Sequence, residues 1–322
     1  MSQAEQVAKF AVRRFPEPPR VAPEPVGPAK IDVLQGLVDR RLNVLCPEAA
    51  GLPHPLGPSI RYSLLAPGKR LRPLLTMLTA IQCGAHAMLP LNVACAAEMV
   101  HVASLVLDDL PCMDNAALRR GQPTNHLTFG EDTAILSAVS LLALAFRTIS
   151  EDEHIPRDTR IALVSDLSRA IGPGGLVAGQ ISDLHDRVAD SGIAAIRERN
   201  FRKTAALFCA CGEAGVIVGG GTDADRVQAC SFAENIGLAF QILDDLKDVI
   251  LSSLQIGKDV RQDWSKRTVV SALGRTHARA ELITHIDRAR EAATRIGIRH
   301  DPLLAFVDRC FPQAALDEIA TG

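Results

Sequence analysis

From residue 31 onward, the sequence carries the apolar spacing of α-helices and little of the alternation typical of β-strands. Its long stretches are rich in Ala, Leu, Glu, Arg and Met, which favour helices, and only 4% of the residues are aromatic. Segments with Pro or Gly separate predicted helices of about 15 to 25 residues. With 322 residues and 47% hydrophobic content, the chain can bury a large core. The pattern predicts one all-α domain over residues 31–322.

The first 30 residues differ from the rest because prolines recur between Phe15 and Pro28. Proline lacks a backbone N–H, so such a segment sustains neither a helix nor a β-ladder. We therefore expect residues 1–30 to form a disordered tail.

Charge and cysteine content narrow the class of protein. A net charge of -2 gives no long-range attraction to nucleic acid. The eight cysteines form no CxxC pair and no secretory leader is recognisable, so we expect reduced, mostly buried thiols and a cytoplasmic location. The longest apolar run, 134–146, is shorter than the roughly 20 residues that span a bilayer, so no membrane anchor is expected.

Two acidic clusters interrupt apolar segments in which carboxylates are costly to place. One spans Asp108 to Asp114, and the other spans Asp244 to Asp248. A buried ionised carboxylate is unfavourable by several kcal/mol unless a cation neutralises it. Either cluster alone is compatible with solvated charges at a helix end, but two with apolar flanks favour a site. Carboxylate oxygens suit Mg²⁺ or Mn²⁺, so the clusters predict metal ions shared with a more negative ligand such as a diphosphate.

The two clusters differ in their predicted geometry. Asp244 and Asp248 are four residues apart, so one regular helix presents both on the same face. Asp108 and Asp114 are six apart and fall on different faces of an ideal helix. Pro111 disfavours a continuous helix, which lets the chain turn and bring Asp114 back beside Asp108.

A diphosphate site also needs cations, and basic residues accompany both clusters. Each one alone is compatible with a solvated surface, but their joint placement favours an anion site. They are Lys69, Arg70 and Arg72 before the first cluster, Arg119 and Arg120 after it, and Lys203, Lys258 and Lys266 on either side of the second.

With these motifs, residues 60–275 resemble the trans-isoprenyl diphosphate synthases, the head-to-tail prenyltransferases, and most of all bacterial geranylgeranyl diphosphate synthases. The segments that carry the resemblance are 68–73 (GKRLRP), 108–115 (DDLPCMDN), 118–126 (LRRGQPTNH), 179–184 (GQISDL), 201–204 (FRKT), 240–245 (FQILDD) and 257–259 (GKD). The resemblance implies a single large helical bundle of the isoprenoid synthase type with a central cavity, and a homodimer.

The resemblance also implies a role for each matching residue. Asp108, Asp114 and Asp244 would contact three Mg²⁺ ions, for which Mn²⁺ can substitute, with Asp109, Asp245 and Asp248 in support. Arg119, Lys203 and Lys258 would hold the allylic diphosphate, and Lys69, Arg72, His101 and Arg120 would hold isopentenyl diphosphate. Thr204, Gln241, Gln180 and Asp183 would line the reacting centre, and Lys266 is a further substrate-binding candidate.

The implied reaction is ionisation of an allylic diphosphate followed by alkylation of isopentenyl diphosphate and release of diphosphate. Dimethylallyl, geranyl and farnesyl diphosphate are the expected allylic substrates. Small residues at Ala103 and Ser104, one turn before Asp108, would form the floor of a product tunnel and favour a C20 product over C15. A bulky residue in place of Ala103 is expected to shorten the product.

Several alternatives stay open. Within the family, farnesyl diphosphate synthase is the first, and a longer-chain polyprenyl synthase is the next. A class I terpene cyclase would replace the second aspartate cluster with an Asn/Asp, Ser/Thr, Glu pattern, which residues 244–248 do not fit. A non-catalytic synthase subunit would lack carboxylates from one cluster, whereas this chain carries all six.

Overall fold

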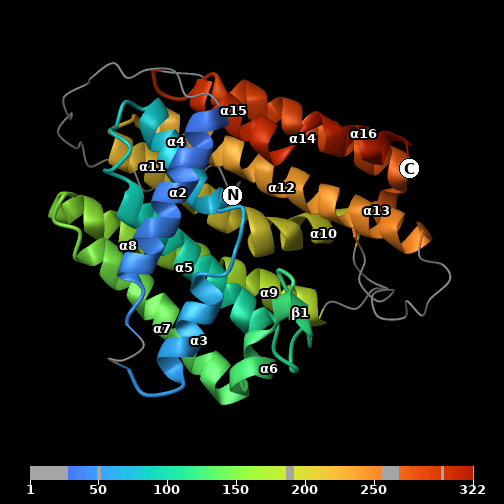
Figure 1. Ribbon diagram of the computed structural model, residues 1–322. Helices are drawn as coiled ribbons and strands as arrows, with labels where there is room; N and C mark the ends of the chain where they lie inside the picture. Colours follow the sequence, from blue (N-terminus) through green and yellow to red (C-terminus); the bar gives the residue numbers. More distant parts are fainter. Residues whose placement is uncertain (1–27, 49–51, 186–191, 255–267, 299–300, 322) are drawn as a thin grey trace.

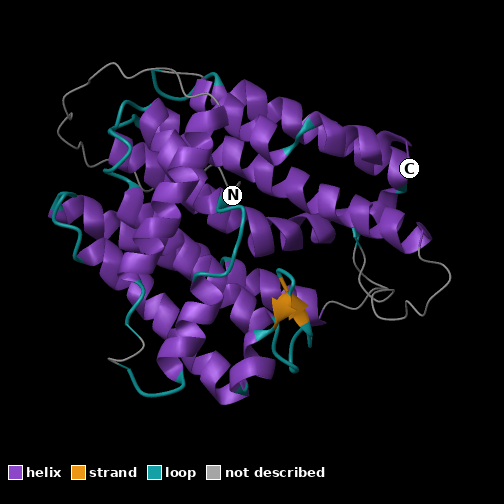
Figure 2. Ribbon diagram, in the orientation of Figure 1, coloured by secondary structure: helices purple, strands orange, loops and turns teal. Residues whose placement is uncertain are grey.

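The computed structural model describes residues 28–48, 52–185, 192–254, 268–298 and 301–321. In this part the chain is helical apart from one short β-hairpin, and Figure 2 shows that hairpin against the helices. The helices are α2 (Pro28–Leu45), α3 (Leu56–Leu64), α4 (Leu71–Gln82), α5 (Leu91–Asp108), α6 (Asn125–Phe129), α7 (Glu131–Ser150), α8 (Arg157–Ile171), α9 (Leu176–His185), α10 (Ile193–Asn200), the π-helix η2 (Phe201–Ala205), α11 (Ala206–Gly219), α12 (Asp223–Leu254), α13 (Val269–Leu273), α14 (Arg275–Ala293), α15 (Asp301–Cys310) and α16 (Gln313–Thr321). Strands β1 (Leu118–Arg119) and β2 (Gln122–Pro123) pair antiparallel. The predicted all-α class is confirmed.

Among the described residues, the first helix is α2, which begins at Pro28, three residues earlier than the pattern predicts. Proline suits the first turn of a helix, where its missing N–H costs no hydrogen bond. Residues 1–27 of the expected tail lie outside the described residues, so the tail remains a prediction.

Neighbouring helices form one continuous bundle, which Figure 1 shows as a single body. Helix α7 packs on α5, α5 on α4, α4 on α11, α11 on α12, and α12 on α14. Helix α8 contacts both α7 and α11 and so closes one side. Helices α5, α11 and α12 therefore run through the bundle and carry the motifs into its interior.

The two most apolar segments have different surroundings. Helix α11 is buried along most of its length, as its composition predicts. Residues 133–149 are also apolar on nearly every face, which predicts burial at the centre of the bundle. That prediction is wrong, because α7 exposes Ile135, Leu136 and Val139 at 43%, 58% and 57%. The opposite side of α7, with Ala138 and Leu141, packs into the core. This helix therefore presents an apolar outer face without a partner in the described chain.

Three segments are long and apolar enough to cross a membrane, judged by length and composition alone. They are Leu91–Asp108, Glu131–Ser150 and Arg157–His185, and the first has 67% of its residues buried inside the bundle. The expected absence of a membrane anchor stays a prediction.

The thiols are free as expected, six of the eight are buried, and Cys112 is exposed.

Candidate active site

The first acidic cluster forms the turn that Pro111 predicts. Helix α5 ends at Asp108, and the backbone N–H of Asp114 donates to the carbonyl oxygen of Asp108 at 2.9 Å. Burial raises the pKa of Asp108, and the nearby charge of Asp114 raises it further, although Lys203 opposes the shift. The two carboxylates therefore repel each other, and a cation between them would relieve that repulsion.

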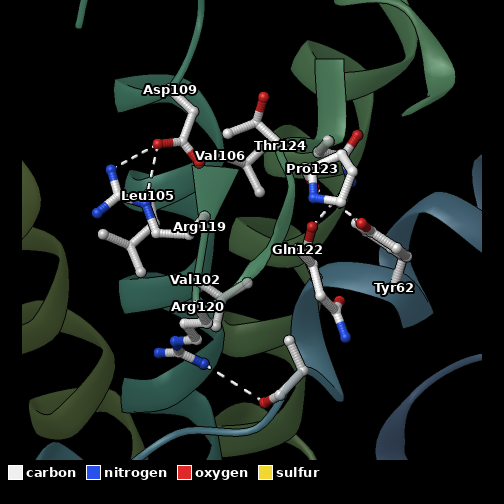
Figure 3. Close-up of a pocket in the computed structure, with 13 residues that line it drawn as sticks. Tyr62, Val102, Leu105, Val106, Asp109, Arg119, Arg120, Gln122, Pro123 and Thr124 are labelled. Carbon is white, nitrogen blue, oxygen red and sulfur yellow. Dashed lines mark hydrogen bonds and ion pairs between the residues drawn. The ribbon is translucent and has the colours of Figure 1, made fainter. Parts of the chain in front are cut away.

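Asp109 turns away from this pair and is buried against Arg119. The carboxylate oxygen Oδ1 of Asp109 accepts from Nε and Nη2 of Arg119 at 2.9 and 2.5 Å. Burial alone would lower the pKa of Arg119, but the hydrogen bond and charge of Asp109 raise it. Figure 3 shows this pair at the wall of a pocket beside the β-hairpin, with Arg120 also on the wall. Asp109 therefore positions Arg119, a predicted ligand of the allylic diphosphate.

Helix α9 and the π-helix η2 place polar groups directly opposite Asp108. Gln180 Nε2 donates a hydrogen bond to Asp108 Oδ1, and Lys203 Nζ lies 3.8 Å from the same oxygen. Lys203 also donates to Asp183 Oδ2 at 2.6 Å, and Arg199 lies 3.6 Å from Asp183 Oδ1. π-Helical turns within longer helices are frequent at functional sites. The predicted residues Gln180, Asp183 and Lys203 are thus brought together at the first motif.

Two glycines let the backbones around η2 approach closely. A Cβ on Gly179 would lie 2.3 Å from the backbone nitrogen of Lys203, and one on Gly237 would lie 2.9 Å from the Cα of Ala205. Both distances are shorter than real Cβ contacts, so a side chain at either position would force the helices apart. Gly179 therefore seats η2 against α9, and Gly237 seats it against α12.

The second acidic cluster lies on the uninterrupted helix α12. Asp244 is exposed, whereas Asp245 is buried and its Oδ1 accepts from Gln241 Nε2 at 3.0 Å. Gln241 Oε1 accepts in turn from the hydroxyl of Thr204 at 3.3 Å. Since Thr204 follows Lys203, the π-helix contacts both clusters. The side chain of Asp248 lies outside the described part.

Cations gather around α4, α5 and the hairpin. Arg70 adopts a left-handed conformation, with φ 49°, and is buried in ion pairs with Glu98 at 2.7 Å and Asp39 at 2.8 Å. Arg72 lies over the Phe208 ring, 4.5 Å from its centre. Its Nε is buried and has no hydrogen-bond partner among the described residues, and burial lowers the pKa of its guanidinium. An anion would supply the missing acceptor.

His101 and Arg120 belong to the same cationic cluster. Burial lowers the pKa of His101 well below its usual value, and the charges of Arg72 and Arg120 lower it further, so this imidazole is neutral. Arg120 lies 3.7 Å from Glu98, and burial lowers its pKa as well. Arg70 and Arg120 share the single buried carboxylate of Glu98, so the region keeps an excess of positive charge that suits a polyanion.

The remaining predicted residues are less closely connected to the cluster. Lys69 is exposed, and its Nζ lies 5.5 Å from the centre of the Phe240 ring on α12. Ala103 is fully buried, and Ser104 is half-buried with its hydroxyl donating to the carbonyl of His101 at 2.8 Å. Lys258 and Lys266 lie outside the described residues.

Sequence reasoning missed Glu98 and Gly237, and it included Gly179 only as part of the segment 179–184, without a role. Glu98 is a carboxylate inside an apolar run, so the burial cost that points to the aspartates would also have pointed to it. The two glycines carry no such signal, because a glycine in a helix reveals its reason only when the neighbouring backbone is in place.

The donor set fits a hard divalent cation. Asp108, Asp114 and Asp244 supply oxygen donors, which Mg²⁺ and Mn²⁺ prefer. Across the described segments, no three His, Cys, Asp or Glu side chains converge closely enough to hold one ion. A metal here would complete its shell with water and substrate oxygens, as Mg²⁺ commonly does.

The chain is similar to known proteins over most of its length. Residues 54–296 match the family described as polyprenyl synthetase. The chain is 42% identical over 267 residues to a geranylgeranyl diphosphate synthase of Pseudescherichia vulneris, covering 82% of this chain and 86% of the relative. It is 44% identical over 257 residues to the enzyme of the same name from Pantoea ananas, covering 79% and 83%. The crystal structure of an FPP/GFPP synthase from Zymomonas mobilis superposes with a TM-score of 0.78 at 34% identity, covering 88% of this chain and 99% of that one.

Proposed function

The chain belongs to the polyprenyl synthetase family and is a prenyltransferase, and we propose that it makes geranylgeranyl diphosphate. It would condense isopentenyl diphosphate with dimethylallyl, geranyl and farnesyl diphosphate and release diphosphate at each step. The product length is supported by the relatives named geranylgeranyl diphosphate synthase and by the small residues Ala103 and Ser104.

One observation carries this proposal: an acidic and a cationic cluster flank the same stretch of α5. Asp108 meets Gln180 and Lys203 at the end of the helix. His101, two turns earlier, lies among Arg72 and Arg120. The reaction needs one diphosphate held through metal ions and a second held by cations alone, and the two clusters offer those different environments.

The polyprenyl synthetases use a divalent metal. We propose that it is Mg²⁺, which prefers oxygen ligands, in three sites to which Asp108, Asp114 and Asp244 contribute. When bound, the metal would neutralise the charge of the departing diphosphate. Lys203 and Arg119 would stabilise the same oxygens, with Asp183 and Asp109 fixing the positions of the two cations. Arg72 and Arg120 would hold isopentenyl diphosphate so that its alkene faces the allylic carbon.

The neutral imidazole of His101 suits the second diphosphate in a specific way. A neutral ring donates one hydrogen bond without adding charge to the crowded cations Arg72 and Arg120. Apolar side chains of the bundle would exclude water from the allylic cation, which water would otherwise quench.

We also propose a homodimer that buries the outer face of α7. Ile135, Leu136 and Val139 together expose an apolar surface of the kind that marks protein interfaces. Replacing all three with Gln or Lys should give a monomer in sedimentation analysis, and an unchanged dimer would place the interface elsewhere. The proposed cytoplasmic location would be tested by cell fractionation.

The proposed function is tested with purified protein, Mg²⁺, labelled isopentenyl diphosphate and each allylic substrate in turn. Dephosphorylated products are then separated by chain length. We expect C20 as the main product from every starter. A C15 or a much longer main product would overturn the proposed length, and the absence of product from all starters would contradict the enzymatic activity itself.

A further inference from the structure

Arg70 belongs to the segment that carries two proposed ligands of isopentenyl diphosphate, but its own guanidinium is buried and directed at protein groups. Its Nε donates to Asp39 of α2 at 2.8 Å, and its Nη1 donates to Glu98 of α5 at 2.7 Å. Its Nη2 donates to the carbonyl oxygen of Ala66, in the loop between α3 and α4, at 2.8 Å. Three acceptors from three parts of the fold therefore fix this side chain in one position.

Arg120, a proposed ligand of isopentenyl diphosphate, approaches two of the same acceptors. Its Nη2 lies 3.7 Å from the Oε1 atom of Glu98 to which Arg70 donates, and its Nη1 lies 3.4 Å from the Ala66 oxygen. The corresponding distances from Arg70 are 2.7 and 2.8 Å. N–H···O hydrogen bonds are usually 2.7–3.2 Å long, so the contacts of Arg120 are weak ones. Arg70 holds the strong bonds to both acceptors.

The pKa values of the two arginines are shifted in opposite directions. Burial disfavours the charged form of Arg70, but the charges and hydrogen bonds of Glu98 and Asp39 outweigh it and raise the pKa. At Arg120, burial exceeds the opposing effect of Glu98, and the charge of Arg70 lowers the pKa further. Arginine stays protonated in proteins, so Arg120 is a buried cation with little compensation. An anionic ligand would supply that compensation.

Backbone conformation also distinguishes the two arginines. Among the described residues, the non-glycine residues with positive φ are Arg70, Asn115 and Arg120, at 49°, 48° and 54°. A bulky residue adopts this region only when its surroundings hold it there, and such residues cluster at ligand-binding sites. The segment 66–70 also approaches Arg120 closely, because a Cβ on Gly68 would lie 2.7 Å from Arg120 Nη1. The segment and Arg120 are therefore fitted to each other.

We propose that Arg70 is a positioning residue: it occupies the protein acceptors that Arg120 would otherwise bind, and it thereby leaves Arg120 to the diphosphate of isopentenyl diphosphate. This inference rests on the proposed function, which makes Arg120 a substrate ligand, and it adds a residue that acts through Arg120. Asp39 contributes from α2 by anchoring the third donor of Arg70. Without Arg70 in this position, Arg120 would move into the short bonds with Glu98.

The test is a double-mutant cycle with Arg120, read by calorimetric titration of isopentenyl diphosphate in the presence of a metal chelator. Arg70→Lys keeps the charge, but an ammonium group cannot reach three separate acceptors as the planar guanidinium does. The Kd should rise about ten-fold, the worth of roughly one charge-assisted hydrogen bond. In an Arg120→Ala background, Arg70→Lys should change the Kd less than about two-fold, because the residue through which it acts is absent.

A second variant tests the anchor on α2. Asp39 is 47% exposed, so Asp39→Asn disturbs the core little, and it should raise the Kd about three-fold, since a neutral acceptor bonds about half as strongly. This effect should also vanish in the Arg120→Ala background. Arg290→Lys, in an exposed pair with Asp308 on α14 and α15, is the matched control and should leave the Kd unchanged.

Steady-state kinetics give an independent measurement of the same inference. Arg70→Lys should raise the KM for isopentenyl diphosphate and leave the KM for the allylic substrate within about two-fold, because Lys203 and Arg119 hold the allylic diphosphate in the proposed site. A general loosening of the fold would raise both KM values. That result would overturn the positioning role of Arg70.

The outcomes separate this inference from the proposed function. An unchanged Kd in Arg70→Lys, or an equal rise with and without Arg120, would overturn the inference. If Arg70→Lys fails to fold in thermal unfolding, the Asp39→Asn cycle decides by the same criterion. If the unmodified protein binds isopentenyl diphosphate but forms no product from any starter, the proposed function is wrong, and the binding cycle still decides the role of Arg70. If it does not bind isopentenyl diphosphate, both are wrong.

Discussion

The two aspartate motifs reach one polar cluster by different backbone routes. The first leaves the end of α5 through a turn in which Asp114 bonds back to Asp108, and ion pairs hold it from two sides. The second stays within α12, where the helix repeat alone sets the spacing, and it is linked to the cluster through Gln241 and Thr204.

This difference separates two ways of positioning a carboxylate. A turn has many conformations, so the first motif needs Arg119, Gln180 and Lys203 to select one of them. A helix has already lost that freedom, so the second motif needs less support. We therefore expect the first motif to depend more on its neighbours than the second.

The largest expected effect comes from removing charge at Asp108. Asp108→Asn should lower kcat by about 10³-fold, since this carboxylate joins the metal site to Gln180 and Lys203. Asp244→Asn, the matched change in the second motif, should cost about ten-fold less. Steady-state kinetics at saturating Mg²⁺ compare the two variants. A larger loss of kcat in Asp244→Asn than in Asp108→Asn would contradict the expectation that the first motif depends more on its neighbours.

The close approach of η2 to its neighbours gives the next effect. Gly179→Ala should lower kcat/KM by about 10²-fold, because the new Cβ would push Lys203 away from Asp108. Gly237→Ala on the second-motif side should have a smaller effect, since its contact is less tight. Gly174→Ala has open space around its Cβ and serves as the control. Equal losses at Gly174 and Gly179 would argue against a positioning role.

The Asp109–Arg119 pair should contribute to stability as well as to binding. Asp109→Asn weakens the bond to Arg119, and we expect the free energy of unfolding to fall by about 1–3 kcal/mol, discounted because Arg119 is 38% exposed. The KM for the allylic substrate should rise. Urea unfolding measures the first effect, with Asp308→Asn as an exposed-pair control that should cost less than about 1 kcal/mol. Equal losses of unfolding free energy in Asp109→Asn and Asp308→Asn would mean that burial of Asp109 does not strengthen its ion pair.

The smallest effect concerns pH. The raised pKa of Asp108 means that it gains a proton at a higher pH than an ordinary aspartate, whose pKa is about 3.9. Mg²⁺ needs the ionised form, so its affinity should weaken as the pH falls toward that raised pKa. The metal-free folded protein binds this proton more tightly than the unfolded chain does. Protonation of Asp108 therefore raises the free energy of unfolding as the pH falls, and its ionisation lowers that free energy as the pH rises.

Calorimetric Mg²⁺ titrations between about pH 7.5 and about pH 5.5 would show the effect. Asp244→Asn, which keeps the first motif, should retain the pH dependence of the unmodified protein. Asp108→Asn should bind Mg²⁺ more weakly and with less dependence on pH. The same slope in both variants would assign the titration to another group.

The sequence predicts the helical class and the turn at Pro111, because helix spacing and proline geometry are local properties. The residues that gather around Asp108, namely Gln180, Asp183 and Lys203, are predicted only through the resemblance to a known family, because they are distant from it in the sequence. It does not predict that Asp109 faces Arg119 or that Arg70 is buried with Glu98, because these pairs depend on how α2, α4 and α5 pack. The exposed face of α7 was also missed. An apolar helix has the same composition whether its own chain or another molecule covers it.

The π-helix at residues 201–205 sets the rotational phase between the helices on either side of it. Its hydrogen bonds span five residues instead of four, so it contains one more residue than a regular turn. Deleting one residue there would restore an α-helical turn and rotate α11 by about 100° relative to α10. If α11 kept its buried face in the core, Lys203 could then no longer face Asp108 and Asp183, and the two carboxylates would lose the cation that they share.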